Sequence, residues 1–427
     1  MPALPGPYMQ QRAELMQNYA AVTDEPSIAT LMKSPQIRRG FHFLDELRAE
    51  LDDELVRICE IPAPPFKEEA RAQFIAQRFR EIGLSLVRSD EEGNVIAERA
   101  GLASGPSSSP RVVISAHLDT VFPERTDVSV RREGARFHAP GISDNVCGIV
   151  SLLTLARALD AGNIVTEGTI YFVATVGEEG EGNLRGVRQL FNKGEFRTGV
   201  DAFVSLDGPG LERITHRALG SRRYRVTING PGGHSWGDFG IVNPVHALGR
   251  AVARFSSYPA PLAPRTSYNV GVIEGGSSVN AIPARASMVV DMRSVSSDEI
   301  DKLEAHLRRV VEIAVREENS QRAMSGTSLT CEFEQAGDRP SGETPVGSPI
   351  VRAAIECSRV LGVEPRLDCS STDSNIPISL GIPAITLGVG GLSGNCHSLT
   401  EWYEPHGREL GLKRLLLLSV SLSGLAC

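Results

Sequence analysis

The pattern of apolar and polar residues predicts helices that alternate with short strands along much of the chain. Apolar residues recur at helical spacing from Phe43 to Ile61, where prolines stop the pattern, and again from Glu68 to Ile82. The expected strands are 94–98, 111–116, 169–175, 201–205 and 383–387, and the expected helices between them include 146–159 and 184–191. Alternating strands and helices predict a three-layer α/β domain with a mostly parallel sheet.

Near Gly220 the order of the predicted elements changes. It becomes strand 222–229, helix 244–255, strand 268–273, strand 286–291, helix 299–316 and strand 328–335. This β-α-β-β-α-β order is that of a ferredoxin-like unit. Because α/β character resumes with a helix at 349–361, the unit is predicted to be a domain inserted into the first one. The expected parts are an N-terminal arm 1–43, an α/β domain of residues 44–217 and 339–427, and the inserted domain 218–338.

Composition narrows the class of protein. A net charge of -8 over 427 residues argues against a nucleic-acid-binding surface, which needs clustered Lys and Arg. No signal peptide is expected at the N-terminus, and the apolar stretch 415–425 is broken by serines and is too short to span a membrane. The seven cysteines are scattered without a C-x-x-C pair, which favours reduced thiols in a cytoplasmic protein.

Candidate chemistry gathers where predicted strands end. In chain order the segments contain His117 and Asp119, then Asp144, then Glu178 and Glu179, then Asp207, and finally His397. In open α/β sheets this edge is where ligands bind. Taken singly, the segments also fit a solvated His–Asp pair, a helix N-cap, an acidic loop or a turn. Taken together, imidazoles and carboxylates at five strand ends favour a site for two divalent ions such as zinc.

Several longer segments resemble the M20 metallopeptidases, a family that includes glutamate carboxypeptidase, acetylornithine deacetylase and tripeptide aminopeptidase. The matching segments are SAHLDTVFP (115–123), PGISDNVCG (140–148), ATVGEEGEGNLRGVR (174–188), SLDGPG (205–210), GPGGHSWGDFG (230–240), GGSSVNAIP (275–283) and DMRS (291–294). The resemblance implies a three-layer zinc-exopeptidase-like catalytic domain, with the ferredoxin-like insertion as a lid or dimerisation domain. One departure is the segment 369–375, where several relatives carry a glycine-rich G-G-S/T-D sequence, which concerns the shape of the specificity pocket.

The resemblance also implies a role for each residue at the strand ends. Asp144 would bridge two metal ions, most simply Zn²⁺, with Mn²⁺ or Co²⁺ as alternatives. His117 and Asp207 would complete one ion, and Glu179 and His397 the other. Glu178 would be the general base toward metal-activated water, and Asp119 would support His117. The peptide bond after Asp144 is expected to be cis, a form that is rare outside proline.

In the lid domain the resemblance implies three substrate-binding residues. His234 would stabilise the oxyanion, often in the active site of the partner subunit, and Asn280 and Arg293 would meet the substrate. A guanidinium is suited to binding a carboxylate, although a structural salt bridge explains Arg293 as well. A homodimer through the lid domain is therefore expected.

The expected function is cleavage of small peptides by a di- or tripeptide exopeptidase. An amidase or deacylase that acts on N-acyl amino acids is the alternative, because no residue pattern separates the two. A metal-free binding protein on the same fold is a further alternative, since fold alone does not establish function. Loss of a metal ligand or of Glu178 would mark such a protein, and all of these residues are present.

Overall fold

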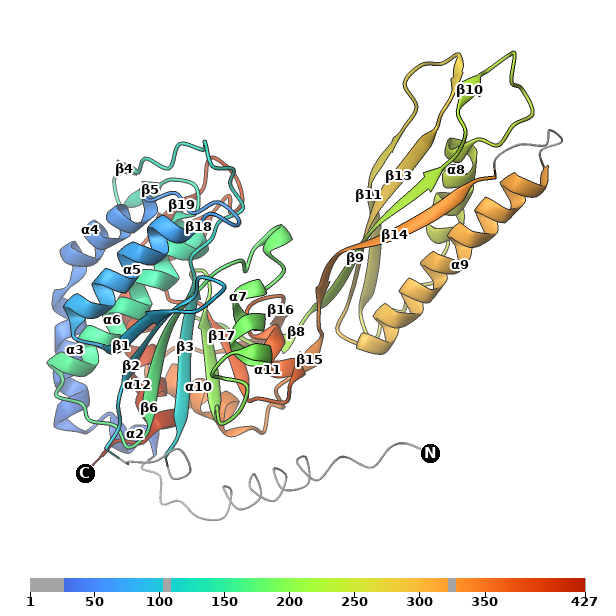
Figure 1. The fold of residues 1–427 in the computed structure, drawn as a ribbon. Helices are drawn as coiled ribbons and strands as arrows, with labels where there is room; N and C mark the ends of the chain where they lie inside the picture. The colour runs from blue at the N-terminus through green and yellow to red at the C-terminus, as the bar shows by residue number, and fades with distance from the viewer. Residues whose placement is uncertain (1–26, 103–108, 322–327, 427) are drawn as a thin grey trace, which may run out of the picture.

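A mixed nine-stranded sheet forms the centre of the larger domain in the computed structural model, which describes residues 27–102, 109–321 and 328–426 (Figure 1). Its strands, in spatial order, are β1 (Ser85–Ser89), β2 (Val95–Arg99), β6 (Thr169–Thr175), β3 (Arg111–His117), β7 (Ala202–Leu206), β17 (Ala384–Leu387), β8 (Arg213–Ala218) and β15 (Gly342–Glu343), and β16 (Arg366–Ser370) pairs with β8. The central strands β6, β3, β7 and β17 are parallel, whereas β1, β2 and β15 pair antiparallel. β8 is antiparallel to β17 but parallel to β16, so the sheet is mixed and its longest run of parallel strands lies at the centre.

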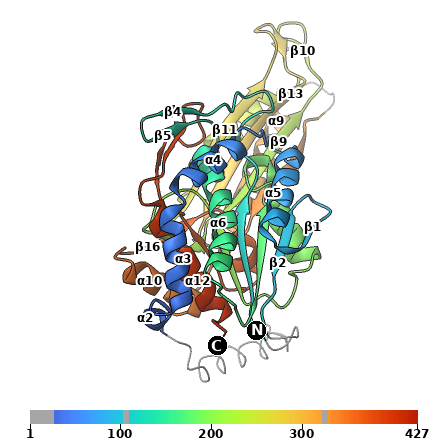
Figure 2. The same cartoon turned by 90° about the vertical axis from the view of Figure 1, so that its left-hand side faces the viewer.

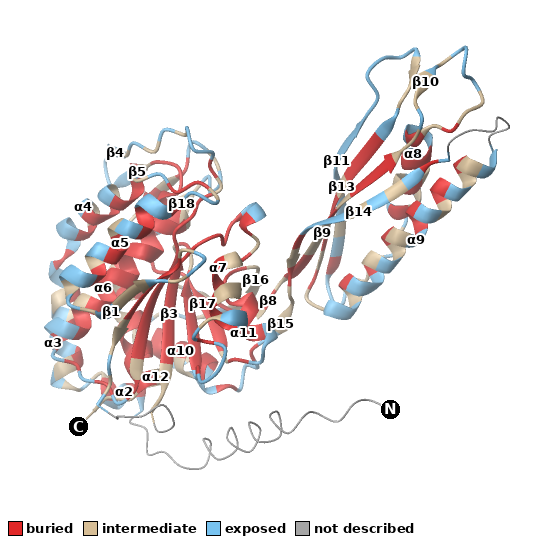
Figure 3. Ribbon diagram, in the orientation of Figure 1, coloured by how far each residue is buried: buried red, intermediate tan, exposed pale blue. Residues whose placement is uncertain are grey.

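Helices cover both faces of this sheet and make the domain three layers thick (Figures 1 and 2). On one face lie α3 (Pro35–Glu46), α4 (Arg48–Cys59), α5 (Glu69–Ile82), α6 (Cys147–Ala161), α10 (Pro349–Val360) and α12 (Arg408–Ser423); on the other lie α7 (Arg185–Arg188), η3 (Gln189–Lys193) and α11 (Asn375–Ser379). Strand side chains alternate between the two layers. Val112 and Ile114 of β3 pack into the first core, whereas Val113 packs into the second. The central strands β6, β3, β7 and β17 are buried on both faces (Figure 3).

The N-terminal part of the chain differs from expectation. Residues 1–26 of the predicted arm lie outside the described residues, but α2 (Ile28–Leu31) and α3 belong to the larger domain. Ile28, Leu31 and Ile37 are buried in its main hydrophobic core. Residues 27–43 therefore pack against the larger domain, and the few apolar positions in this polar stretch did not predict it.

The smaller domain is a four-stranded antiparallel sheet with the spatial order β11-β13-β9-β14. The chain order is β9 (Gly220–Asn229), α8 (Pro244–Phe255), β11 (Thr266–Gly275), β13 (Arg285–Ser294), α9 (Ser297–Gln321) and β14 (Thr330–Arg339). This is the predicted β-α-β-β-α-β order. The two helices and the sheet enclose a separate core that includes Val226, Phe255 and Leu307. A two-stranded ribbon of β10 (Gly233–His234) and β12 (Ala281–Ile282) lies at the end of this domain away from the nine-stranded sheet (Figure 1).

A second four-stranded sheet stands beside the carboxyl ends of the central strands. It consists of β18 (Leu392–Gly394), β19 (Trp402–Glu404), β5 (Arg136–His138) and β4 (Arg131–Glu133), and two short turns, η1 (Ile142–Val146) and η2 (Gly180–Gly182), lie at the same edge. In the described part of the chain one segment, Ile142–Ala161, is long and apolar enough to cross a membrane, but 89% of it is buried inside the domain. It therefore has the character of a core helix.

Candidate metal centre

The parallel centre of the large sheet brings the predicted site residues to one edge. His117 is the last residue of β3, Glu178 and Glu179 follow β6, and Asp207 directly follows β7. Because these strands are parallel, their carboxyl ends lie side by side. Asp144 stands in η1, just before α6, and His397 follows β18.

Asp144 lies between the two histidines and offers one oxygen to each. Its Oδ1 is 3.0 Å from His117 Nε2, and its Oδ2 is 3.0 Å from His397 Nε2. His397 Nε2 is also 2.9 Å from Glu179 Oε1, and His117 Nε2 is 3.8 Å from Asp207 Oδ1. Two groups of ligand atoms therefore share one carboxylate, which is the arrangement that suits two neighbouring cations.

The electrostatic environment of Asp144 and the two histidines favours positive charge where the two groups of ligand atoms meet. Burial alone would raise the pKa of Asp144, but hydrogen bonds to His117 and His397 hold it well below its usual value. Burial alone would lower the pKa of His117, but its bonds to Asp119, Asp144 and Asp207 raise it well above the usual value. Hydrogen bonds to Asp144, Cys396 and Glu179 raise the pKa of His397. Imidazole nitrogens and carboxylate oxygens in such a field fit zinc-like divalent ions.

Asp119 holds the loop that carries the two glutamates. Its Oδ1 accepts a hydrogen bond from the backbone N–H of Glu178 at 2.9 Å, and its Oδ2 accepts one from Glu179 at 2.8 Å. Oδ1 also lies 3.6 Å from His117 Nδ1, and that nitrogen is 3.1 Å from the backbone oxygen of Asp119. One buried carboxylate thus orients both an imidazole and the Glu178–Glu179 pair, as carboxylates behind metal ligands do.

Glu401 performs a similar task for Asp144 and was not predicted from the sequence. This fully buried carboxylate accepts hydrogen bonds from the N–H groups of Gly141, Ser143 and Asp144 at 3.0, 2.8 and 3.1 Å, and from Ser143 Oγ at 2.7 Å. The Asp144–Asn145 peptide bond is cis, which confirms the expectation from the resemblance. The signal in the sequence was a lone acidic residue four positions after His397, which has no pattern of its own.

Glu178 is buried beside these residues. Burial raises its pKa well above the usual value, the guanidinium of Arg339 opposes the rise, and Glu179 adds to it. Arg339 Nη1 donates to Glu178 Oε1 at 3.1 Å. Arg339 had not been singled out in the sequence, because it stands at the end of β14, 161 positions from Glu178.

A cleft joins this site to the base of the smaller domain. Its lining includes Asp144, Glu178, Glu179, Asp207 and His397, the arginines Arg213, Arg223, Arg293 and Arg339, and Cys369, Ser370 and Ser371 from the segment that departs from the family pattern. Arg293 thus lies at the cleft, with its Nε 2.7 Å from Asp291 Oδ2.

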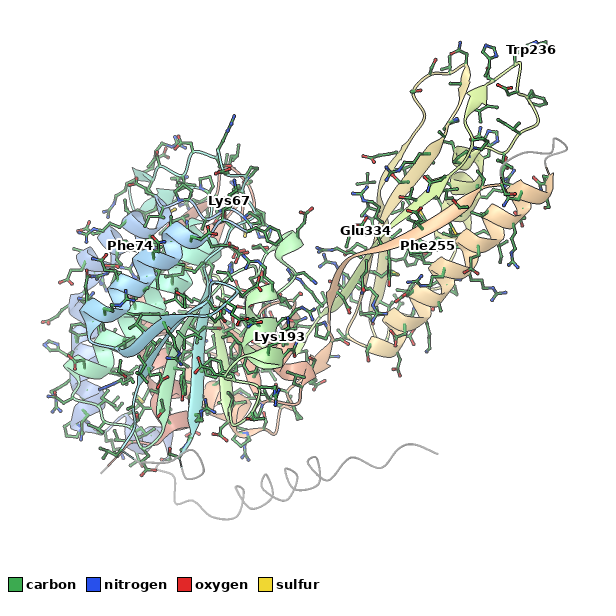
Figure 4. All side chains as sticks on the ribbon, in the orientation of Figure 1. Lys67, Phe74, Lys193, Trp236, Phe255 and Glu334 are labelled. Atoms are coloured by element: carbon green, nitrogen blue, oxygen red, sulfur yellow. The ribbon has the colours of Figure 1, made fainter. Side chains whose placement is uncertain are left out.

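The other two residues predicted to bind substrate lie elsewhere. His234 and Asn280 are in and beside the β10–β12 ribbon, are exposed, and do not line the cleft. Trp236, two residues after His234, marks this tip in Figure 4. The structure therefore gathers the five candidate ligands, Glu178, Asp119 and Arg293, but not His234 or Asn280.

Comparison with known proteins agrees with the geometry. Residues 113–418 match the sequence pattern of Peptidase family M20/M25/M40. Over 368 residues the chain is 26% identical to a cytosol non-specific dipeptidase of Escherichia coli, covering 76% of this chain and 72% of that protein. It is 23% identical to an N-acetylcysteine deacetylase of Bacillus subtilis, over 62% of this chain and 63% of the relative.

Solved structures share the fold. A tripeptidase of Staphylococcus aureus superposes with a TM-score of 0.73 at 20% identity, covering 87% of this chain and 98% of that one. A Bacillus subtilis protein described as a dinuclear metal-binding peptidase of the M20 family superposes with a TM-score of 0.65 at 18% identity, covering 90% and 100% of the two chains.

Proposed function

The chain belongs to Peptidase family M20/M25/M40, and from this premise we propose that it is a di-zinc exopeptidase that cleaves the amide bond of di- or tripeptides. The observation that carries the proposal is the position of Asp144 between His117 and His397, with Glu178 in the same cleft. A metal-free binding protein is disfavoured, because such a protein has no need of five converging ligand side chains beside a buried glutamate.

Five residues would hold the two ions. His117, Asp144 and Asp207 would bind one, and Asp144, Glu179 and His397 the other. When bound, such ions supply a Lewis acid for the amide carbonyl and lower the pKa of water toward about 7. Zinc suits the nitrogen and oxygen donors, and Mn²⁺ or Co²⁺ would fit the same set.

The protein's own groups have distinct tasks in this proposal. Glu178 takes a proton from the attacking water and later passes it to the leaving amine, and its burial favours this because a base works best with a pKa near the working pH. Arg293 would bind a carboxylate of the substrate. His234 of the partner subunit would donate to the oxyanion, and Asn280, in the loop next to it, would contact the substrate.

A deacylase acting on N-acyl amino acids is the second candidate. It is supported by the similarity to an N-acetylcysteine deacetylase, and peptide bonds and N-acyl bonds are both amides. Chains of this kind would work in the cytoplasm, as the name of the Escherichia coli dipeptidase indicates for that relative.

The test combines a substrate panel with two variants. Dipeptides, tripeptides and N-acyl amino acids are assayed with zinc, manganese and cobalt, and the larger kcat/KM decides between exopeptidase and deacylase. Glu178→Gln should keep about two equivalents of metal by elemental analysis, but lose roughly 10²- to 10⁴-fold in kcat. Glu179→Gln is the matched control, since the same change one position later should weaken metal binding. An active Glu178→Gln enzyme, or equal loss of metal from both, would refute the assignment.

A further inference from the structure

Arg339 is the last residue of β14, the strand through which the chain leaves the smaller domain. Its side chain is only 8% exposed. Nη1 donates to Glu178 Oε1 and to Ser371 Oγ, each at 3.1 Å, and Nη2 donates to the backbone oxygen of Glu178. One guanidinium thus binds both the side chain and the main chain of Glu178.

The strand that carries Arg339 is itself fixed to the loop after Glu179. The N–H of Asp338 donates to Asn183 Oδ1 at 3.0 Å, and Arg188 Nη2 donates to the backbone oxygen of Asp338. Arg339 of β14 pairs with Ser221 of β9, and these are the two strands that connect the domains. The backbone that carries Arg339 is therefore held against the larger domain by more than one contact.

We propose that Arg339 is the positioning residue for Glu178. The proposal rests on the proposed function, in which Glu178 is the general base. Among the described residues, Arg339 is the group that hydrogen-bonds to the Glu178 carboxylate, and it does so through Oε1. This contact fixes the rotamer of the carboxylate and leaves Oε2 for the proton transfer. The planar fork of arginine can hold the backbone and the carboxylate together, which the single ammonium of lysine cannot.

The physical consequence is an effect on turnover, not on binding. A misplaced base lowers the rate of the chemical step, because displacement by about 1 Å can cost on the order of 10²-fold. The side chain of Arg339 hydrogen-bonds to Glu178 and Ser371 and not to the candidate metal ligands, so metal content and KM should change little when Arg339 is changed.

The experiment compares Arg339→Met with Arg188→Met in the metal-loaded enzyme. Arg188 also connects the two domains, through the backbone oxygen of Asp338, but makes no hydrogen bond to Glu178. It therefore controls for a general loosening of the contact between the domains. Arg339→Met should lower kcat on the order of 10²-fold, with KM within about threefold and two equivalents of metal retained, whereas Arg188→Met should stay close to wild type. If Arg339→Met does not fold, Arg339→Lys takes its place and should show a smaller loss in kcat.

A double-mutant cycle separates positioning from other roles. In a Glu178→Gln background, Arg339→Met should cost less than about threefold more in kcat, because the group it positions is already gone. The proposal would be overturned by losses in kcat that multiply in the double variant, by a loss confined to KM, or by an equal loss in Arg188→Met. These results would leave Glu178 as the base. An active Glu178→Gln enzyme would instead refute the proposed function itself.

Discussion

Asp373 is a buried carboxyl group whose environment disfavours its charge. It lies in the segment 369–375, is 1% exposed, and accepts a hydrogen bond from Thr175 Oγ1 at 2.5 Å through Oδ2. Among the described residues its Oδ1 has no hydrogen-bond partner. Burial raises the pKa of Asp373 from 3.8 to about 6, against the opposing effect of the Thr175 bond. The folded protein therefore holds a proton on Asp373 more tightly than the unfolded chain does.

This shift predicts a pH dependence of stability that Asp373→Asn removes. A group whose folded pKa is raised contributes stability below its unfolded pKa, and the contribution is lost as pH rises through the folded pKa. In the metal-free protein, the free energy of unfolding of wild type should therefore fall relative to Asp373→Asn between about pH 4 and pH 7, by roughly 3 kcal/mol. Urea unfolding at a series of pH values measures it, with Asp53→Asn as a control for removal of an exposed charge. A difference that does not vary with pH would contradict it.

At the residue scale, the sequence predicts those site residues that stand next to the end of a predicted strand. His117, Glu179 and Asp207 stand within a few positions of strand ends, and a parallel sheet brings such ends together. Their role as metal ligands stays a prediction. Glu401 and Arg339 could not be predicted, because each acts through contacts with a loop more than 150 positions away. No local pattern distinguishes such a residue from a surface charge.

At the scale of elements, α12 packs unusually close to the loop that follows β17. A Cβ atom built on Gly411 would lie 2.1 Å from the backbone oxygen of Val389, which has little freedom to move. Gly249, in the middle of α8, offers the opposite case, since a Cβ there would meet no heavy atom within 4 Å. The two helices thus provide a matched pair of glycines.

Substituting alanine at these positions should have opposite effects on stability. Gly411→Ala should destabilise by roughly 1–3 kcal/mol through overpacking. Gly249→Ala should stabilise by roughly 0.5–1 kcal/mol, because alanine loses less backbone entropy in a helix. Calorimetric unfolding follows both, and because each helix lies in a different domain, each change should affect a different transition if the domains unfold separately. A Gly411→Ala protein as stable as wild type would contradict the close packing of α12 against the backbone of Val389.

The periodicity of apolar residues predicted where helices and strands lie better than it predicted which strands pair. The strand at 169–175 and the helix at 244–255 have the expected bounds, since each is a continuous apolar or amphipathic run between clear breaks. The short strands β4, β5, β18 and β19 were not predicted, because three residues are too few for a period of two to show. Periodicity also does not give the direction of a strand, because direction depends on how the chain returns to the sheet. In the structure β1, β2 and β15 pair antiparallel, whereas β16 pairs with β8 in parallel.

At the scale of the whole molecule, the smaller domain extends away from the larger one and carries β10 at its far end (Figures 1 and 4). His234 Nδ1 accepts hydrogen bonds from the N–H groups of Trp236 and Gly237 at 3.2 and 3.1 Å, so the ring is held with Nε2 as its remaining donor. Trp236 and Phe239 of the same loop are 88% and 75% exposed. Such an ordered, apolar tip without contact to its own cleft suits insertion into another subunit.

The last prediction is that two chains form a homodimer and exchange this tip. The strands β11 and β14 are sheet edges, and an edge can pair with its own copy about a two-fold axis. Sedimentation should show a dimer, and His234→Ala should lower turnover by roughly 10²- to 10³-fold while both metals stay bound. In co-expressed heterodimers of His234→Ala and Glu178→Gln chains, one site receives Glu178 from the first chain and His234 of the partner subunit. That site should regain activity, up to about one wild-type site per mixed dimer. Heterodimers that stay inactive, or a monomer in sedimentation, would place His234 outside the partner's reaction and remove the reason for an exchanged tip.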